Sequence, residues 1–585
     1  MANYYYTNER NVQIVISLLK QYGIKRIIVS PGATNVTFVA SVMHDSFFEL
    51  YSCVDERSAA YMACGMAAES GEAVVISCTG ATASRNYLPG LTEAYYRKLP
   101  VIAITSTQNP LRIGNLIAQV IDRSAIQNDV SIYSFMAESI HDAESERACV
   151  IGINKALHLA TSANSGPVHI NLQTQYSSDY SVQQLPIAQK IGFYQHGDAL
   201  PNIPKGRLGI FVGSHKPFTQ EETEVIDVFC GSYDAVVFCD HTSGYKGRYR
   251  FLGALLASQV NCDYAQLKMS LCIHLGEVSG DYPTQTIIGK SATIWRVSLD
   301  GEPRDTFKKL SAVFQMTPKE FFSYYAKKDG GSNRDLFLQS CRDEYQRIYD
   351  AIPEDIPFSN IWIAKQLSSK LPEHSVLHLG ILNSLRSWNL FDVHPSIQEY
   401  CNVGGFGIDG CMSSLIGASL VHLDKLYFGV LGDLAFFYDM NAMGSRHIGK
   451  NLRILVVNNG RGMEFRNYNH HASVFGEETD NYIAAARHYG NQSSTLLKHY
   501  AEDLGFRYIS ATDKESFQKN LSTFISTIVD KPIIFEVFTN CEDENQALYN
   551  VCHIKQMEGK QKLKEDVRKM IGDNGVAAIK RILKR

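Results

Sequence analysis

Two short polar segments of the sequence could together hold a divalent cation. Gly432-Asp433-Leu434 follows one apolar run, and Asn458-Asn459 follows the next apolar run along the chain. The residues between them suffice for a helix and a return strand, so both segments are expected at carboxyl ends of parallel strands, where open α/β sheets bind ligands. Carboxylate and amide oxygens are hard donors suited to Mg²⁺, which is often shared with phosphate groups. Each segment alone is better explained as a helix cap or a turn, but their combination at this spacing favours a magnesium and diphosphate site.

Glu56 is a second candidate functional residue. It stands in Asp55-Glu56-Arg57-Ser58, directly before an Ala-rich stretch that predicts a helix. A carboxylate at this position either interacts with the helix dipole or acts as a functional acid, and the residues alone leave both readings open. The loops at 30–35 and 78–82 each follow a predicted strand and are typical βα loops.

These candidates require a framework, and the chain predicts alternating strands and helices. Near-continuous apolar runs separated by amphipathic segments are typical of parallel sheets covered by helices on both faces. The predicted fold class is α/β, with three doubly wound parallel-sheet domains. Their expected ranges are 1–180, 195–345 and 355–555, with a basic helical tail at 556–585 and a linker within 173–207. The expected strands are 24–29, 73–78, 101–105, 166–171, 208–212, 235–239, 271–275, 293–297, 375–379, 426–431, 452–457 and 532–538.

The composition is that of an ordinary globular protein. The chain has 585 residues, of which 45% are hydrophobic and 20% charged, and its formal net charge is −4. This balance gives no sign of nucleic-acid binding. No secretory signal and no apolar run of membrane-spanning length occurs, so we expect a cytoplasmic protein without membrane contact. The 13 cysteines contain no CxxC pair, which favours buried thiols over disulfides or a zinc site.

Several segments resemble thiamin-diphosphate-dependent enzymes of the acetolactate synthase and 2-oxoacid decarboxylase superfamily. The Gly432-Asp433-Leu434 and Asn458-Asn459 segments are similar to the family's diphosphate–magnesium motif, and Glu56 matches its cofactor glutamate. The resemblance implies a pyrimidine-binding, a central and a diphosphate-binding domain, in that order. Within the superfamily, the segments at 55–67, 405–410 and 431–443 resemble the 2-succinyl-5-enolpyruvyl-6-hydroxy-3-cyclohexene-1-carboxylate (SEPHCHC) synthases of menaquinone biosynthesis.

The resemblance implies a role for each matching residue. Glu56 would hydrogen-bond N1′ of the aminopyrimidine, and Gln119 would be a polar group beside the reacting carbon. Mg²⁺ would be held by Asp433, by Asn459 and by the carbonyl of Arg461. Ile408 would be the apolar support that keeps the cofactor bent, and the remaining cofactor contacts would be Gly407, Leu434, Gly462 and Met463. FAD is not expected. A homodimer or a dimer of dimers, with active sites between subunits, is expected.

The sequence departs from the SEPHCHC synthases where these carry arginines. Thr34, Trp388 and Val403 stand at three such positions. We therefore predict decarboxylation of a 2-oxoacid, with pyruvate favoured, and carboligation of the resulting acyl carbanion to an aldehyde or ketone. The alternatives are SEPHCHC synthase acting on 2-oxoglutarate and isochorismate, a simple 2-oxoacid decarboxylase, and a non-catalytic relative that binds the cofactor. Candidate substrate residues are Thr34, Asn35, Ser384, Arg386, Trp388 and Glu464.

One basic segment lies outside these motifs. Lys246, Arg248 and Arg250 follow one another at short spacing in the predicted central domain. We predict a solvated loop there; the alternative is a contact with an anionic acceptor.

Overall fold

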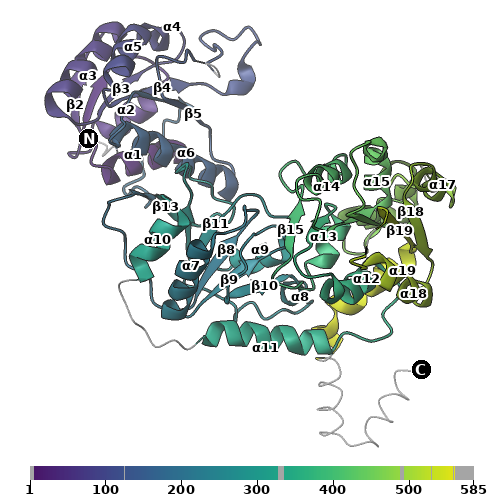
Figure 1. Cartoon of the computed structure of the whole chain (residues 1–585). Coiled ribbons are helices and arrows are strands. Elements are labelled where there is room, and N and C mark those ends of the chain that lie inside the picture. Colours follow the sequence, from purple (N-terminus) through teal and green to yellow (C-terminus); the bar gives the residue numbers. More distant parts are fainter. Residues whose placement is uncertain are drawn as a thin grey trace, which may run out of the picture. The chain divides into compact units, whose positions relative to one another are not determined.

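The computed structural model describes residues 5–123, 126–326, 335–487, 493–528, 530–557 and 559 (Figure 1). Within these ranges the chain forms two compact units. The first comprises the residues up to Asp198 together with Asp300–Gln315, and the second comprises Ala199–Leu299 together with the residues from Met316 onward. Beyond residue 559, the predicted basic tail lies outside the described residues.

The first unit contains a six-stranded parallel sheet in the order β2-β1-β3-β4-β6-β5. Its strands are β1 (Arg26–Val29), β2 (Glu49–Ser52), β3 (Val74–Cys78), β4 (Val101–Thr107), β5 (Tyr133–Ala137) and β6 (Val168–Gln173). A second parallel pair, β7 (Gly192–Gln195) with β13 (Leu310–Gln315), also belongs to this unit. β7 lies within the predicted linker.

Helices cover both faces of the first sheet because its strands carry apolar side chains on both sides. One core cluster joins Ile27 and Val75 to α1 (Arg10–Gln21), α2 (Val36–Val42) and α6 (Ala143–Thr161). A second cluster joins the neighbouring residues Ile28 and Val74 to α3 (Glu56–Ser70), α4 (Thr82–Asn86) and α5 (Leu88–Arg97). Figure 1 shows α3 and α5 on the opposite side of this sheet from α1 and α6.

The second unit contains two further groups of parallel strands. The central group runs β10-β9-β8-β11-β12, and the last sheet runs β15-β14-β16-β17-β19-β18. The central strands are β8 (Leu208–Val212), β9 (Ala235–Cys239), β10 (Arg250–Leu252), β11 (Leu271–Leu275) and β12 (Ile294–Val297). The last six are β14 (Val376–Leu379), β15 (Gln398–Cys401), β16 (Tyr427–Gly432), β17 (Leu452–Asn458), β18 (Arg507–Ala511) and β19 (Ile533–Phe538).

The helices of the second unit follow the same alternation. Those around the central strands are α7 (Gln220–Tyr233), α8 (Ala254–Ala257), α9 (Tyr282–Ile288), α10 (Pro318–Ala326) and α11 (Leu336–Asp350). The last part contains α12 (Asn360–Leu367), α13 (Asn383–Trp388), α14 (Cys411–Ser419), α15 (Asp433–Asp439), α16 (Thr479–Tyr482), α17 (Leu496–Asp503), α18 (Lys514–Phe524) and α19 (Cys541–Cys552). Short 3₁₀ segments are η1 (Pro110–Arg112), η2 (Ser368–Lys370), η3 (Met440–Gly444), η4 (Met463–Arg466) and η5 (His471–Glu478).

The predicted fold class is confirmed, since every sheet is parallel and helices flank the strands. All twelve expected strands form, with ends within two residues of those predicted. Each predicted domain contains the strands of one group, and the predicted central range 195–345 also contains β13, which belongs to the first unit. The domain limits stay predictions. All 13 cysteines are free thiols. Among the described helices, none has the length and apolarity needed to cross a membrane.

Candidate active site

The carboxyl edge of the last sheet brings the two predicted polar segments together. β16 ends at Gly432 and pairs in parallel with β17, with Gly432 opposite Val457. Asp433 starts α15 directly after β16, and Asn459 directly follows β17. Asp433 is only 2% exposed. The N–H of Gly460 donates to its Oδ2 at 3.0 Å, which fixes one carboxylate oxygen beside the loop after β17.

This edge fits a cation and a diphosphate. Asn459 Oδ1 is buried, and no described residue donates a hydrogen bond to it. A buried amide oxygen without a donor is unfavourable unless a ligand completes it, and an amide oxygen is a suitable ligand for Mg²⁺. At Gly432, a Cβ atom would meet nothing within 4 Å, so the backbone leaves open space beside Asp433.

A cavity at this edge gathers most of the predicted cofactor residues. Nine of the predicted site residues line it: Ser384, Ile408, Asp433, Leu434, Asn459, Arg461, Gly462, Met463 and Glu464. We call it the diphosphate cavity. Gly407 does not line it, although its neighbour Ile408 does. The Arg461 side chain pairs with Asp480 at 2.7 Å, which holds the loop after β17 in place. The role of the Arg461 carbonyl stays a prediction.

Glu56 is the first residue of α3 in the first unit. Asp55, not Glu56, caps this helix, because its side chain accepts the N–H of Ser58 at 3.0 Å. Glu56 is half-buried, and its Oε2 accepts a hydrogen bond from Asn86 Nδ2 at 3.1 Å. Glu56 is therefore not the cap of α3, but as an acid in the first turn it is still placed favourably for the helix dipole, and its role toward a cofactor stays a prediction.

The other predicted residues of the first unit differ in accessibility. Gln119 is exposed and adopts a positive φ of 64°. Thr34 and Asn35 are buried and hold loops together. The Thr34 hydroxyl accepts the N–H of Gly80 at 3.1 Å and donates to the carbonyl of Ser106 at 3.2 Å. The structure thus gives Thr34 a structural role, while its contact with a substrate stays a prediction.

Helix α13 carries three of the predicted substrate residues in different environments. Ser384 lines the diphosphate cavity, and Arg386 forms an ion pair with Glu464. Trp388 has no exposed surface and lines neither this cavity nor the larger one described below. Its large side chain packs in the core. The expectation of a substrate contact at Trp388 therefore has no support in this structure.

The expectation of a solvated basic loop is wrong for two of its three residues. The Lys246 and Arg250 side chains are 24% and 9% exposed and both contact the buried carboxylate of Glu399. His241 Nδ1 lies 3.2 Å from the same carboxylate. Burial raises the pKa of Glu399, but His241, Arg250 and Lys246 outweigh it and lower the pKa to about 2. Sequence spacing identified the charges but not their buried partner. Arg248 remains 60% exposed.

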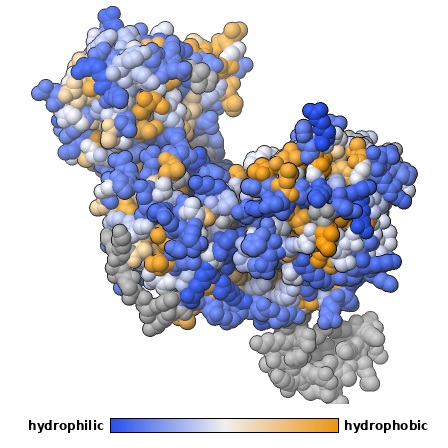
Figure 2. Space-filling model, viewed as in Figure 1, coloured by the Kyte–Doolittle hydropathy of each residue, from blue (hydrophilic) through white to orange (hydrophobic). Residues whose placement is uncertain are grey.

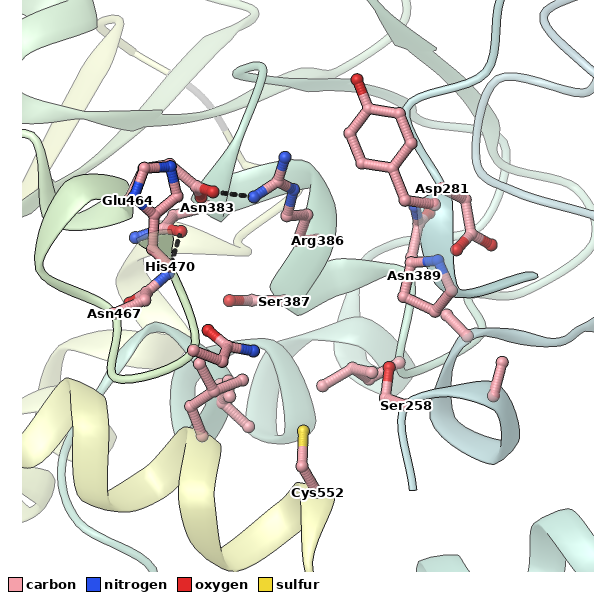
Figure 3. Close-up of a pocket in the computed structure, with 18 of the residues that line it drawn as sticks. Ser258, Asp281, Asn383, Arg386, Ser387, Asn389, Glu464, Asn467, His470 and Cys552 are labelled. Carbon is pink, nitrogen blue, oxygen red and sulfur yellow. Dashed lines mark hydrogen bonds and ion pairs between the residues drawn. The ribbon is translucent and has the colours of Figure 1, made fainter. Parts of the chain in front are cut away.

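A second, larger cavity was not predicted. It has a volume of about 640 Å³ and lies between the central helices α8 and α9 on one side and α13, η4 and α19 on the other. Figure 3 shows Glu464, Asn467 and His470 on one wall, Asp281, Asn389 and Ser258 on the other, and Arg386 and Ser387 between them. The one signal in the sequence was the polar segment around Asp281, which follows the buried strand β11.

Comparisons with known proteins indicate the class of enzyme that this chain resembles. Residues 10–135 match the family model described as "Thiamine pyrophosphate enzyme, N-terminal TPP binding domain". This match and the relatives described next support an enzyme that depends on thiamin diphosphate. Over nearly its whole length it resembles proteins named 2-succinyl-5-enolpyruvyl-6-hydroxy-3-cyclohexene-1-carboxylate synthase. The relative from Bacteroides thetaiotaomicron is 28% identical over 573 residues, which cover 94% of this chain and 99% of the relative. The relative from Desulfotalea psychrophila is 27% identical and covers 89% of this chain and 96% of its own length.

Proposed function

We propose that the protein releases CO₂ from a 2-oxoacid and transfers the remaining acyl group to a carbonyl acceptor, with thiamin diphosphate and Mg²⁺. The observation that carries this proposal is the carboxyl edge of the last sheet, where buried Asp433 adjoins the unpartnered oxygen of Asn459. When bound, thiamin diphosphate supplies an electron sink for the charge left on the carbonyl carbon when CO₂ leaves.

The chain's own residues would bind and orient the cofactor. Asp433 and Asn459 would hold Mg²⁺ with the carbonyl of Arg461. Ile408 would support the bent cofactor from below. Glu56 would hold a proton at N1′ of the aminopyrimidine, and Gln119 would offer a hydrogen bond beside the reacting carbon. Glu56 is the candidate general acid–base group because it matches the family's cofactor glutamate and carries a half-buried carboxyl group, which accepts a hydrogen bond from Asn86.

The reaction balances without an external oxidant. A 2-oxoacid, R–CO–COO⁻, loses CO₂ as its C–C bond breaks, and the electron pair stays with the acyl carbon. This carbon forms a bond to the carbonyl carbon of R′–CHO, and the acceptor oxygen takes one proton. The products are CO₂ and R–CO–CH(OH)–R′. In a simple decarboxylase, a proton takes the place of the acceptor.

Two 2-oxoacids, 2-oxoglutarate and pyruvate, are the candidate donors. The names of the relatives favour the SEPHCHC synthase alternative, with 2-oxoglutarate as donor and isochorismate as acceptor. Pyruvate is favoured by the absence of charge at Thr34 and Val403, both buried. Arg386 is the one cation among the candidate substrate residues, and Glu464 already pairs with it.

An assembly of at least two copies is part of the proposal. η1 and the loop after it expose four large apolar side chains, a few residues before Gln119 in the chain, and Figure 2 shows apolar surface on the first unit. They are Leu111, Ile113, Leu116 and Ile117. Exposed apolar clusters of this kind commonly mark interaction surfaces. We expect a homodimer or a dimer of dimers that covers this loop.

The test is a donor panel assayed with added thiamin diphosphate and Mg²⁺. We expect CO₂ release from 2-oxoglutarate, pyruvate or both, with carboligation products identified by mass spectrometry. Calorimetry with thiamin diphosphate and Mg²⁺ establishes that the cofactor is bound in the same preparation. Cofactor binding without CO₂ release from any 2-oxoacid would contradict the proposed function.

A further inference from the structure

The large cavity adjoins the diphosphate cavity. Asn383 and Glu464 line both, so the two spaces share part of one wall. Helix α13 contributes Ser384 to the diphosphate cavity and Arg386 to the large one. A molecule in the large cavity would therefore lie next to the bound cofactor and within reach of residues from the central strands and their helices.

The charges of this cavity favour cations and neutral molecules over anions. Arg386 is the only Lys or Arg among its described lining residues, and its guanidinium is paired with Glu464 and lies over the Tyr282 ring. Two further carboxyl groups, Asp281 and Glu544, line the same space and are buried. Binding of an anionic ligand is therefore unfavourable for two reasons. The ligand would find Arg386 already paired, and it would lie close to buried carboxyl groups where solvent screens charges weakly.

Asp281 has an unfilled hydrogen-bonding position. Its Oδ1 accepts the N–H of Thr284 at 3.1 Å, whereas Oδ2 has no hydrogen bond with any described residue. The residue is 2% exposed, and burial raises its pKa to about 7. A carboxyl group in this state both accepts hydrogen bonds and, when protonated, donates one.

Other polar groups around the cavity are neutral. Asn389 Oδ1 accepts the N–H of His241 at 3.2 Å, but Nδ2 is buried without a partner among the described residues. Ser258 and Ser387 add hydroxyl groups from opposite sides, as Figure 3 shows. The described lining thus offers hydroxyl and amide groups, the carboxyl groups of Asp281, Glu464 and Glu544, and the imidazole rings of His470 and His553. Among these described residues no guanidinium or ammonium group is unpaired.

We propose that the large cavity binds the acceptor, and that this acceptor is a carbonyl compound bearing hydroxyl groups and no anionic group. This inference rests on the proposed function and adds the chemical class of the second substrate. A hydroxyl group can bond to Asp281 in either protonation state and to Asn389, whereas a carboxylate of the same length is repelled by the ionised form of Asp281 and finds Arg386 already paired. Sites built to hydrogen-bond a hydroxyl discriminate strongly against ligands that lack it.

The experiment compares two acceptors that differ only in this group. The holoenzyme is given its best 2-oxoacid donor with either 4-hydroxybutanal or succinic semialdehyde, and carboligation is measured as kcat/KM for the acceptor. We expect the hydroxyaldehyde to be preferred at least tenfold. Equal use of the two, or preference for succinic semialdehyde, would overturn the proposal.

Variants assign the preference to the cavity. Asp281→Lys should shift the ratio of the two kcat/KM values at least tenfold toward succinic semialdehyde, and Asp281→Asn should shift it severalfold in the same direction. Glu224→Lys makes the same change of charge on an exposed face of α7 and should leave the ratio unaltered. A ratio in Asp281→Asn equal to that of the wild type would refute the assignment even if the lysine variant did not fold.

The outcomes also separate this inference from the proposed function. CO₂ release recorded without acceptor reports on the donor reaction alone. If CO₂ is released but the acceptor preference is reversed, the assignment of the cavity fails and the proposed function stands. If the cofactor-loaded protein releases no CO₂ from any donor, the proposed function itself fails.

Discussion

The first and last sheets have the same strand order but differ at their carboxyl edges. The order β2-β1-β3-β4-β6-β5 corresponds strand for strand to β15-β14-β16-β17-β19-β18. In the first sheet, the Thr34 hydroxyl connects the loop after β1 to the loop after β3 through Gly80 and to the end of β4 through Ser106. In the last sheet, Asp433 and Asn459 follow β16 and β17, and an amide oxygen of Asn459 is left without a donor.

This difference shows that topology alone does not determine the chemistry of an edge. Both sheets place loops at the carboxyl ends of equivalent strands, where open α/β sheets bind ligands. The neutral hydroxyl of Thr34 connects the loops of one edge to each other. The acid and amide of the other edge leave a position that a metal ion can fill. Function therefore follows from a few residues at strand ends, as is general for folds that host many activities.

The largest expected effect is at Glu56. Glu56→Gln keeps the shape and the hydrogen bond from Asn86 but removes the acid group. If Glu56 exchanges a proton with the cofactor, turnover falls by about 10²–10⁴-fold, the range typical of general acid–base groups. Steady-state CO₂ release with saturating cofactor measures this. Asp55→Asn, which changes only the cap of the same helix, is the control, and a Glu56→Gln enzyme as fast as this control would disprove the role.

A second expected effect concerns the other edge. Asp433→Asn replaces one carboxylate oxygen with an amide nitrogen, which cannot bind Mg²⁺. We expect the affinity for thiamin diphosphate in the presence of Mg²⁺ to fall about 10- to 100-fold, on the scale known for altered metal sites. Calorimetric titration measures it, with Asp424→Asn, at an exposed position in the loop before β16, as the control. Unchanged affinity in Asp433→Asn would place the metal elsewhere.

The sequence predicted central strands and missed edge strands. β3, β4, β16 and β17 lie inside their sheets and read as near-continuous apolar runs. Five of the unpredicted strands, β2, β5, β10, β15 and β18, stand at an end of a strand order. The sequence also missed β7 and β13, which pair with each other in the first unit. All four residues of β2 are exposed, so its pattern resembles that of a loop. Edge strands are determined by pairing with a neighbour distant in sequence, which a local pattern does not contain.

The same limit explains which parts of the site were predictable. Asp433 and Asn459 each follow an apolar strand directly, so their positions were evident from local sequence. The large cavity depends on how α9 packs near α13, and it brings Asp281 and Arg386 together from two separate groups of strands. Burial was also not predictable for Trp388, expected at a substrate, and for Lys246, expected in solvent. The sequence shows the type of a residue but not the neighbours that enclose it in the fold.

A smaller effect is expected at Thr34, whose hydroxyl forms neutral hydrogen bonds at the carboxyl edge of the first sheet. Thr34→Val has nearly the same shape but removes the hydroxyl, and it leaves the buried N–H of Gly80 without this acceptor. We expect a loss of about 1–3 kcal/mol in the free energy of unfolding, the usual cost of an unsatisfied buried group. Thermal unfolding compares it with Thr161→Val, an exposed threonine on α6. Equal midpoints would show that the hydroxyl contributes nothing to this edge.

The smallest expected effect concerns pH and the last sheet. Asn458 at the end of β17 donates to Glu536 of β19 at 2.7 Å, and Tyr508 donates to the same carboxyl group at 2.8 Å. Burial raises the pKa of Glu536 above its ordinary value of 4.5, despite these two hydrogen bonds. Because the folded chain then holds this proton to a higher pH than the unfolded chain, its contribution to stability is complete below pH 4.5 and decreases as the pH rises.

Glu536→Gln removes this titration while retaining a side-chain oxygen that can accept the Asn458 amide. We expect the thermal midpoint of the variant to fall less than that of the wild type between pH 4.5 and pH 7.5. Glu515→Gln removes an exposed acid from α18 and should follow the wild-type curve. A Glu536→Gln curve parallel to the wild type would mean that this carboxyl group is ionised as readily in the folded as in the unfolded chain. In that case Asp433 and Asn459 alone, and not Glu536, would distinguish the carboxyl edge of the last sheet from that of the first.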